Sequence, residues 1–491
     1  TTVRLPEEPK LGILVLIPVY KERKMAYNFI ECDRETICLM PPSLREWLPQ
    51  DDLAWFVLDA VAQMDLSKFY GKYRADGWGR SAYDPGMMVS LILYAYSNGM
   101  LSSRKIERAC HVDVAFRIIA ANQRPDYSTI CRFRAENEKE LRQLFTQVLR
   151  LCAQAGLVKV GVIAIDGTKM KAAAALAANR THDKLKAEVE RIFEKAKAED
   201  AEDDRLYGSD KRGDELPEEL RSRESRLKRL KEAKARLEQE AAAEAAKQTA
   251  KIEKRRVKEK ETGKPATGRP PNAPNEGPDE NARANVTDPE SRVMKTAAGQ
   301  HIQGYNAQIA VTKNQIIIAA DVTQTGGDQP LLNPMLEKAK ESLKEAGIKQ
   351  KIKNALADAG YWSQVNLMNA DPKGPQLLIA TTKEREQRKA ALAQAPPRGR
   401  IPKGLTLVEL MERKLLSAKG RRLYKLRRET VEPVFGQIKS ARGCEGFLRR
   451  RLHAVVSEWS LYCSTHNLLK LWRSGKAKFN WAVRRPALAF A

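Results

Sequence analysis

The sequence contains few residues that bind transition metals or form disulfides. Only five histidines and seven cysteines occur among 491 residues, and no C-x-x-C, H-E-x-x-H or H-x₃₋₅-H spacing is present. These absences exclude the common structural zinc sites and the zinc proteases. An odd number of scattered cysteines is typical of reduced thiols in the cytosol. Any metal ion in this protein would therefore be held by oxygen ligands.

Long hydrophobic runs are also lacking. The most apolar run, residues 11–20, contains Pro18 and is shorter than the roughly 18 residues needed to span a bilayer. No small-residue cleavage site follows it. We therefore expect no membrane-spanning segment and no signal peptide. Residues 1–24, which precede Met25, are interpreted as an extension that is not part of the fold.

Acidic residues are too few to balance the basic ones. The chain has 87 Lys and Arg against 62 Asp and Glu, a formal net charge of +25. This exceeds what solubility requires and predicts a polyanionic partner, either nucleic acid or an anionic membrane surface. The length corresponds to about two to four domains.

Hydrophobic periodicity indicates a helical region followed by strands. Apolar residues recur at helical spacing as far as residue 158. After that point, a β-branched run of strand length predicts a strand at 160–166. Further short strands are predicted at 304–311 and 316–324, which form a hairpin, and at 353–360 and 376–382. A helix is expected over 328–346, and another begins at Thr430 as N-cap with Pro433 in its first turn.

A charged segment interrupts the predicted strands. Leucines at heptad-like offsets over 184–264 predict two helical, coiled-coil-like arms with a break near 208–217, and a Pro-rich linker follows at 261–280. The fold class is therefore α+β or α/β, with a mixed sheet and an inserted helical segment. The expected parts are an extension (1–24), a helical N-terminal domain (25–158), a sheet domain (159–180 plus 300–445), the insertion (181–299) and a helical tail (446–491).

Three carboxylates fall at positions that suit a catalytic site. Asp166 and Asp358 each end a predicted strand and are followed closely by glycine, although isolated Asp-Gly pairs are usually turns. The third is Glu432, which shares one helical face with Tyr424, Arg428 and Lys439 at offsets of four, four and seven. The ordinary alternative is a surface helix in which Glu432 pairs with Arg428.

Carboxylates from two strands and a helix are suited to binding two Mg²⁺ ions, which Mn²⁺ can replace. Arg428 and Lys439 would then neutralise phosphates, the first as a bidentate fork and the second as a point charge. Together with the net charge, this pattern favours DNA or RNA as the substrate.

The sequence resembles the DDE transposases of bacterial insertion sequences, in the group with a Tyr-Arg-Glu-Lys signature. The resemblance begins at Met25 and rests on segments that include DPGMMVSLILYAYSNGM, IAIDGTKMKA, NALADAGYWS and TVEPVFGQIK. It implies an RNase H-like catalytic core, with Asp166, Asp358 and Glu432 as the metal-binding triad. The surrounding signature residues, which are expected to bind DNA, are then Tyr424, Arg428 and Lys439. Some members carry a large insertion between the last two carboxylates, whereas here the insertion follows Asp166.

The resemblance also implies an activity and its partners. We expect a homodimer that binds double-stranded DNA at the element's terminal repeats, cleaves it and transfers the ends to target DNA, in the cytoplasm and near the nucleoid. Arg104, Arg132 and Arg134 of the helical domain are expected to bind the ends by helix-turn-helix docking. Lys169 and Lys171, just after Asp166, are expected to approach DNA at the site, although all five could simply be solvated.

Two other classes of protein fit the same composition. A basic architectural protein that binds DNA without cutting it would need only the net charge and the basic helices. An RNase H-like nuclease would cut DNA without joining it. An inactive element copy is a further alternative.

Overall fold

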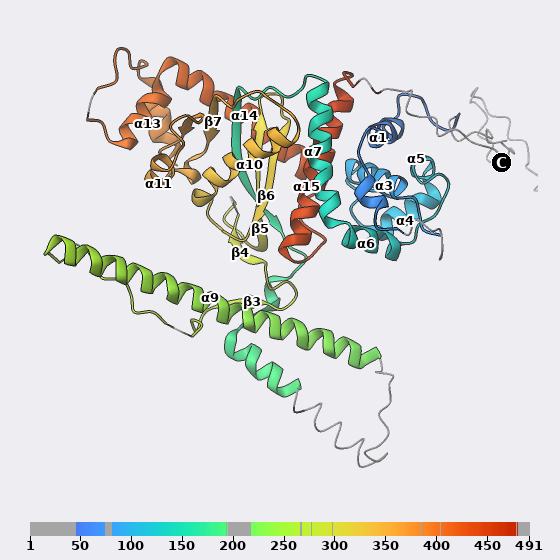
Figure 1. Ribbon diagram of the computed structural model, residues 1–491, viewed down its shortest axis with the longest axis horizontal. Coiled ribbons are helices and arrows are strands. Elements are labelled where there is room, and N and C mark those ends of the chain that lie inside the picture. Colours follow the sequence, from blue (N-terminus) through green and yellow to red (C-terminus); the bar gives the residue numbers. More distant parts are fainter. Residues whose placement is uncertain are drawn as a thin grey trace, which may run out of the picture. The chain divides into compact units, whose positions relative to one another are not determined.

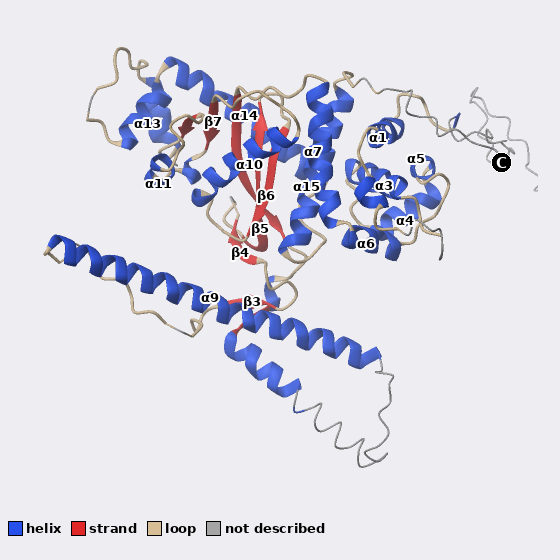
Figure 2. Ribbon diagram, in the orientation of Figure 1, coloured by secondary structure: helices blue, strands red, loops and turns tan. Residues whose placement is uncertain are grey.

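The computed structural model describes residues 46–73, 81–192, 194 and 218–479, except 266, 267, 276, 297, 383, 403 and 478. Within these ranges the chain has a six-stranded mixed sheet, a two-stranded sheet and many helices (Figure 1, Figure 2). The expected mixed α and β composition is confirmed. The expected extension 1–24 and the break near 208–217 lie outside the described residues.

The main sheet places β1 (Val162–Lys171) at its centre. On one side β1 pairs antiparallel with β5 (His301–Thr312), and β5 pairs antiparallel with β6 (Ile317–Thr323) and β4 (Arg292–Lys295). On the other side β1 pairs in parallel with β7 (Asn354–Ala357), which pairs in parallel with β8 (Gln376–Ile379). The hairpin and all five predicted strands are present. The sequence does not predict β4, because four residues are too few to show a period of two.

The free edge of β6 is covered by α15 (Leu452–Arg473). The side-chain amide of Asn467 accepts the N–H of Ile317 at 2.9 Å and donates to its carbonyl at 2.8 Å. Trp459 is fully buried and its indole N–H donates to the carbonyl of Gln308 at 3.1 Å. The predicted tail helix is thus part of the core, and it protects a strand edge that would otherwise remain unpaired.

The helical region before β1 contains seven helices in the described residues. Buried apolar faces pack α3 against α1 and α5, while α7 packs against α15. Aspartates cap several of these helices: Asp84 accepts the N–H of Met87 at 2.7 Å, and Asp126 accepts that of Thr129 at 2.9 Å. The bounds are α1 (Leu53–Ala62), α2 (Ser67–Tyr70), α3 (Pro85–Ser97), α4 (Ser103–Val112), α5 (Val114–Ile119), α6 (Tyr127–Glu136) and α7 (Glu138–Gln154).

Further helices pack around the main sheet. The predicted helix after the hairpin is α10 (Leu332–Glu345), which contacts β5 and β6. The remaining helices are α11 (Gln364–Met368), α12 (Arg385–Ala393), α13 (Leu407–Leu416) and α14 (Ala418–Gly436), and a π-helical turn (Gln437–Ala441) continues α14. No described helix is long and apolar enough to cross a membrane.

Helix α14 corrects the prediction that a helix begins at Thr430. Its N-cap lies thirteen residues earlier, at Ser417, which accepts the N–H of Gly420 at 3.0 Å. Pro433 therefore lies inside the helix, where it cannot donate to the carbonyl of Glu429. The side-chain amide of Gln315 donates to that carbonyl instead, at 3.0 Å. A contact from the hairpin turn thus satisfies the hydrogen bond that the proline removes.

The insertion has a hydrophobic core of its own. A helix at 182–192 packs against α9 (Glu218–Thr262) through Leu185, Leu230, Ala233 and Leu237, as the heptad-like spacing predicts. At its base, β2 (Asn179–Thr181) pairs antiparallel with β3 (Arg283–Asn285), which contacts α9 (Figure 1). The entering and leaving segments are therefore joined, so an insertion of this length need not disturb the main sheet.

Candidate active site

Two of the predicted carboxylates lie level with each other on neighbouring parallel strands. The register of β1 and β7 pairs Ala164 with Leu356. Two residues further, Asp166 follows on β1 and Asp358 comes directly after β7. The prediction that the first strand ends at Asp166 was wrong, because β1 remains paired with β5 as far as Lys171. Because β7 ends just before Asp358, its pairing with β1 stops short of Asp166, and the site opens at this level.

The glycine that follows each aspartate allows close packing. Asp166 Oδ1 accepts the N–H of Gly167 at 2.9 Å, and Asp358 Oδ1 accepts that of Gly360 at 2.8 Å. A Cβ atom on Gly167 would lie 2.0 Å from Nε2 of Gln308, and one on Gly360 would lie 3.0 Å from Asp358 Oδ1. A larger residue at Gly167 would therefore displace a buried side chain next to the carboxylates.

Glu432 reaches the same place from α14. Burial of Tyr424, Val431 and Val434 fixes which face of this helix turns inward. Arg427 follows Tyr424 by three residues and lies on that face. The predicted residue, Arg428, is rotated outward: its side chain is 75% exposed, and its Nε lies 3.8 Å from Glu432 Oε2.

The guanidinium of Arg427 lies among the three carboxylates. Its Nη2 is 2.8 Å from Asp166 Oδ2 and 3.8 Å from Asp358 Oδ2, and its Nη1 is 3.5 Å from Glu432 Oε1. Asp166 and Arg427 are largely buried, whereas Asp358 and Glu432 are 40% and 49% exposed. Three carboxylates from segments distant in sequence thus surround one guanidinium beside β1, where β7 ends.

Burial dominates the electrostatics of Asp166. It raises the pKa of this carboxyl to about 7, although the adjacent Arg427 guanidinium acts in the opposite direction. The neighbouring Asp358 raises the pKa further, because two nearby carboxylates disfavour each other's charged form. A cation brought close to Asp166 would therefore stabilise its ionised state.

A fourth acidic residue, Asp328, borders the site and was not predicted. Its Oδ1 accepts hydrogen bonds from Asn306 at 2.7 Å and Gln308 at 3.0 Å, and lies 3.1 Å from Lys169 Nζ. Gln308 also accepts a short hydrogen bond from the buried Tyr361 hydroxyl. The polar residues of GYNAQIAV, alternating along β5, are the sequence signal that could have revealed this network.

The other predicted residues near the site differ in position. Lys439 donates to Thr168 Oγ1 at 2.5 Å and to the carbonyl of Lys169 at 3.0 Å, so its charge lies beside β1. Burial lowers the pKa of Lys439. Tyr424 is buried and its hydroxyl donates to the carbonyl of Ala357 at 3.1 Å, so it ties α14 to the end of β7 and does not fit the expected contact with DNA. Lys171 is exposed at the end of β1.

Comparison with known families matches two separate parts of the chain. A family described as "Transposase domain (DUF772)" matches residues 42–136, and a family described as "Transposase DDE domain" matches residues 282–468. The second match includes Asp358 and Glu432, and together the matches cover more than half of the chain. The chain belongs to the DDE transposases of insertion sequences. No curated protein and no solved structure gives a significant match to this transposase.

The predicted DNA-binding arginines of the transposase's helical region differ in exposure. Arg104 lies on α4, with its guanidinium 5.0 Å from the ring centre of Tyr127, and Arg132 is exposed on α6. Arg134 is only 6% exposed and donates to the Tyr96 hydroxyl at 2.9 Å. Its guanidinium also donates to the carbonyl of Leu101 and to Ser103. The prediction that Arg134 contacts DNA therefore does not fit, because its side chain is used inside the helical core.

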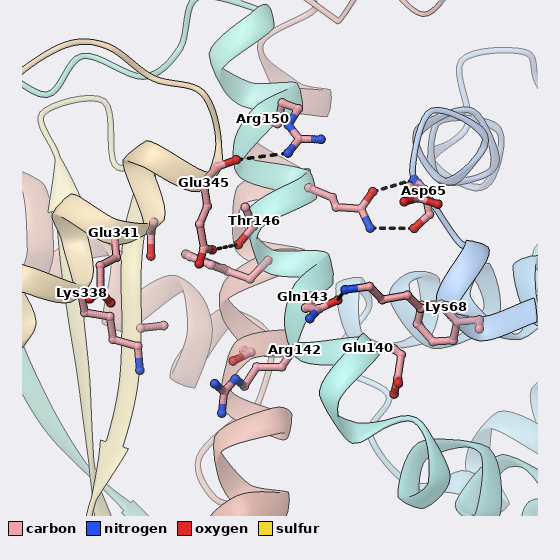
Figure 3. A pocket seen from close by; sticks show the side chains of 16 residues that line it. Asp65, Lys68, Glu140, Arg142, Gln143, Thr146, Arg150, Lys338, Glu341 and Glu345 are labelled. Carbon is pink, nitrogen blue, oxygen red and sulfur yellow. Dashed lines mark hydrogen bonds between the residues drawn. The ribbon is translucent and has the colours of Figure 1, made fainter. Parts of the chain in front are cut away.

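A polar pocket elsewhere lies beside α7 (Figure 3). Lys68 donates to Gln143 at 3.0 Å, and Thr146 donates to Glu345 at 3.2 Å. Arg150 donates to the backbone carbonyl of Glu345 at 3.2 Å. These bonds connect α7 to α2 on one side and to the end of α10 on the other. The pocket thus lies between helices that are hydrogen-bonded to one another, and none of the three carboxylates lines it.

The donor set of the carboxylate site fits a divalent cation in kind. Within the described residues, no three acidic, histidine or cysteine side chains lie close enough together to hold a metal ion as they stand. Asp166, Asp358 and Glu432 nevertheless supply hard oxygen atoms of the type that Mg²⁺ prefers. They already surround one cation, the Arg427 guanidinium. The site therefore attracts positive charge, and its carboxylates have to regroup to bind a metal ion.

Proposed function

We propose that this transposase cleaves DNA at the ends of its element and joins those ends to target DNA, with Asp166, Asp358 and Glu432 as the catalytic triad. The observation that carries this proposal is the convergence of the three carboxylates on a single guanidinium. They come from β1, from the end of β7 and from α14, so only the folded chain brings them together.

The strand order supports an RNase H-like catalytic core. Antiparallel strands β6, β5 and β1 are followed by the parallel strands β7 and β8. We assign the core to residues 159–180 plus 300–445, the DNA-end-binding region to 25–158 and the insertion to 181–299. The helical tail, 446–491, would support the sheet through α15.

We infer that the triad holds two Mg²⁺ ions, or Mn²⁺ in their place. The bound ions would activate the attacking oxygen and stabilise the leaving oxygen of an in-line phosphodiester displacement. The role of the chain is to fix the carboxylates and orient the DNA backbone, because phosphoryl transfer depends mainly on positioning and charge. The hydrogen bonds from Gly167 and Gly360 restrain the two aspartates for this purpose.

Basic residues beside the triad would bind the DNA strand that reacts. Lys439 and Lys169 carry their ammonium groups beside β1, and Lys171 follows at its exposed end. Arg428 lies beside Glu432 on the solvent side of α14, where its side chain is exposed enough to reach a phosphate. Arg104 and Arg132 remain available for the element ends.

The distal half of α9 supports a second DNA contact. Lys247, Lys251, Lys254 and Lys258 are exposed and recur at intervals of four, three and four, so they lie on one helical face. We call these four residues the lysine stripe. Of these four residues, only Lys247 makes an ion pair with another described residue, Glu244, at 3.7 Å. The stripe would therefore meet DNA phosphates without first giving up strong internal partners.

A cleavage assay on DNA that carries the borders of the element tests the proposal. The full chain is incubated with Mg²⁺ or EDTA, beside Asp358→Asn and the matched control Asp371→Asn, whose side chain is exposed and 3.7 Å from Lys340 Nζ. We expect Mg²⁺-dependent cuts at one border position, followed by joined products. Asp358→Asn should reduce cutting by about 1,000-fold or more, whereas Asp371→Asn should cut like wild type.

The same assay separates the alternatives. Border DNA that is bound but never cut with any divalent ion would indicate an architectural protein or an inactive copy. Cuts without joined products would indicate a nuclease. Because two ends must be held together for joining, we also propose a homodimer on DNA at the nucleoid. A cleavage complex that contains one protein chain would contradict that part of the proposal.

A further inference from the structure

The position of Arg427 bears on how the site admits a metal ion. Its guanidinium is the only basic group that forms ion pairs with all three carboxylates among the described residues. Removing this charge would leave three carboxylates facing one another, one of them buried, which is unfavourable both by repulsion and by desolvation. Arg427 therefore acts as the counter-charge of the site in the metal-free chain.

The contacts of Arg427 are too incomplete to fix it there. Only the approach to Asp166, at 2.8 Å, has the length of a strong charge-assisted hydrogen bond, while the other two are 3.5 and 3.8 Å. The buried Nε of Arg427 has no hydrogen-bond partner among the described residues. The guanidinium is thus held by charge more than by geometry.

The surroundings offer the guanidinium another position. Arg427 also lines a cavity formed by α12, α13 and α14, whose other basic lining residues include Arg388, Lys389 and Lys425. A phosphate of bound DNA in this cavity would provide an alternative anion for Arg427. Movement toward the cavity would free the three carboxylates.

We propose that Arg427 is a removable internal cation that competes with divalent metal ions for Asp166, Asp358 and Glu432. This inference rests on the proposed function, because it takes the triad as the metal site. A metal ion and the guanidinium cannot occupy the space between the carboxylates together. Metal binding therefore requires Arg427 to withdraw, and the metal affinity of the free chain is lowered by the competition.

Binding of Mn²⁺ to the full chain without DNA tests this competition directly. The free Mn²⁺ signal in electron paramagnetic resonance would be titrated for wild type, Arg427→Gln, Asp358→Asn and the control Arg422→Gln. Arg422 is exposed on the same helix, so its substitution removes the same net charge at a distance from the triad. We expect Arg427→Gln to bind Mn²⁺ at least tenfold more tightly than wild type, and Arg422→Gln to differ by less than twofold.

A melting experiment provides an independent measurement. In EDTA, Arg427→Gln should melt below wild type because the carboxylates have lost their counter-charge, and Mn²⁺ should raise its melting temperature more than that of wild type. If Arg427→Gln does not fold without metal, Arg427→Lys replaces it in the titration. A single ammonium reaches fewer of the carboxylates, so this variant should also bind Mn²⁺ more tightly than wild type, by a smaller factor.

The outcomes distinguish this inference from the proposed function. If wild type and Arg427→Gln bind Mn²⁺ equally, or the variant binds more weakly, Arg427 only positions the carboxylates and the competition is overturned. If neither binds Mn²⁺ at millimolar concentration, the metal site itself is wrong and both proposals fail. Loss of binding in Asp358→Asn, together with a gain in Arg427→Gln, supports both.

Discussion

Basic residues serve two different purposes in the carboxylate site and in α9. In the site, Arg427 is largely buried and forms ion pairs with three carboxylates of the same chain. On α9, the lysine stripe is exposed, and within the part of the chain that the structure describes only Lys247 of the stripe forms an ion pair. Burial commits a charge to partners within the protein, because an unpaired charge is costly only away from water. An exposed charge remains available to any polyanion.

This comparison predicts that substitutions in the site reduce the cleavage rate, whereas substitutions on α9 reduce DNA affinity. The largest effect is expected in the site. Asp166→Asn keeps the shape of the side chain but removes a carboxylate of the triad. We expect cleavage of border DNA to fall by about 1,000-fold or more, which corresponds to about 4 kcal/mol of transition-state stabilisation. Cleavage rates at saturating protein, with DNA affinity measured separately, check this. If Asp166→Asn lost affinity for DNA and kept the cleavage rate, the proposed difference between the site and the lysine stripe would be wrong.

Substitution of the lysine stripe should change DNA affinity and its salt dependence. Each phosphate contact contributes about 0.9 to the slope of log K against log salt. Replacing Lys247, Lys251, Lys254 and Lys258 with Ala should therefore lower the slope by about 3 to 4. The melting temperature should stay close to that of wild type, because these side chains are exposed. An unchanged slope would show that the lysine stripe does not contact DNA phosphates.

Buried charge should also affect stability as the pH changes. Burial lowers the pKa of His466 on α15 to about 3 from 6.5, and the nearby Arg442 and Lys470 act in the same direction. The unfolded chain therefore binds this proton more readily between pH 6.5 and 3, so stability falls as the pH drops through that range. From pH 7 to pH 5 the loss should be about 2 kcal/mol.

Denaturant unfolding of wild type and His466→Gln at both pH values isolates this effect. The buried Glu458, whose pKa is raised by burial, contributes with the opposite sign in both proteins and cancels in the difference. The acid loss should be smaller in the variant by about 2 kcal/mol. Equal losses in the two proteins would show that His466 is protonated in the folded state.

The sequence predicts the strands of the site better than its helix. A β-branched run locates β1 and a short apolar run before Asp-Ala-Gly locates β7, and therefore Asp166 and Asp358, because strands of this kind are evident from their own residues. The predicted start of α14 was wrong because a proline is normally tolerated only in the first turn of a helix, so the helix was expected to begin just before Pro433. It is accommodated by Gln315, a partner more than a hundred residues away that no local pattern reveals.

The phase of α14 could have been predicted more closely. Offsets of four residues relate Tyr424, Arg428 and Glu432, but the apolar residues Val431 and Val434 turn the helix so that Arg427 faces inward. A difference of one residue rotates a side chain by about 100°, which is enough to exchange a buried arginine for an exposed one. By contrast, nothing local distinguishes the buried Arg134 from its exposed neighbour Arg132, because its partners come from other helices and loops.

The smallest expected effect lies on the outer side of α14 and completes the comparison on a single helix. Lys425 Nζ is 3.9 Å from Glu429 Oε1, with the two side chains 80% and 56% exposed. A double-mutant cycle with Ala at both positions should give a coupling of about 0.3 to 0.5 kcal/mol that declines further in salt. Arg427 lies only two residues along the same helix, but it pairs with Asp166 of β1 and lies largely away from water. If the exposed pair coupled by more than about 1 kcal/mol, exposure would not be what separates the two kinds of charge.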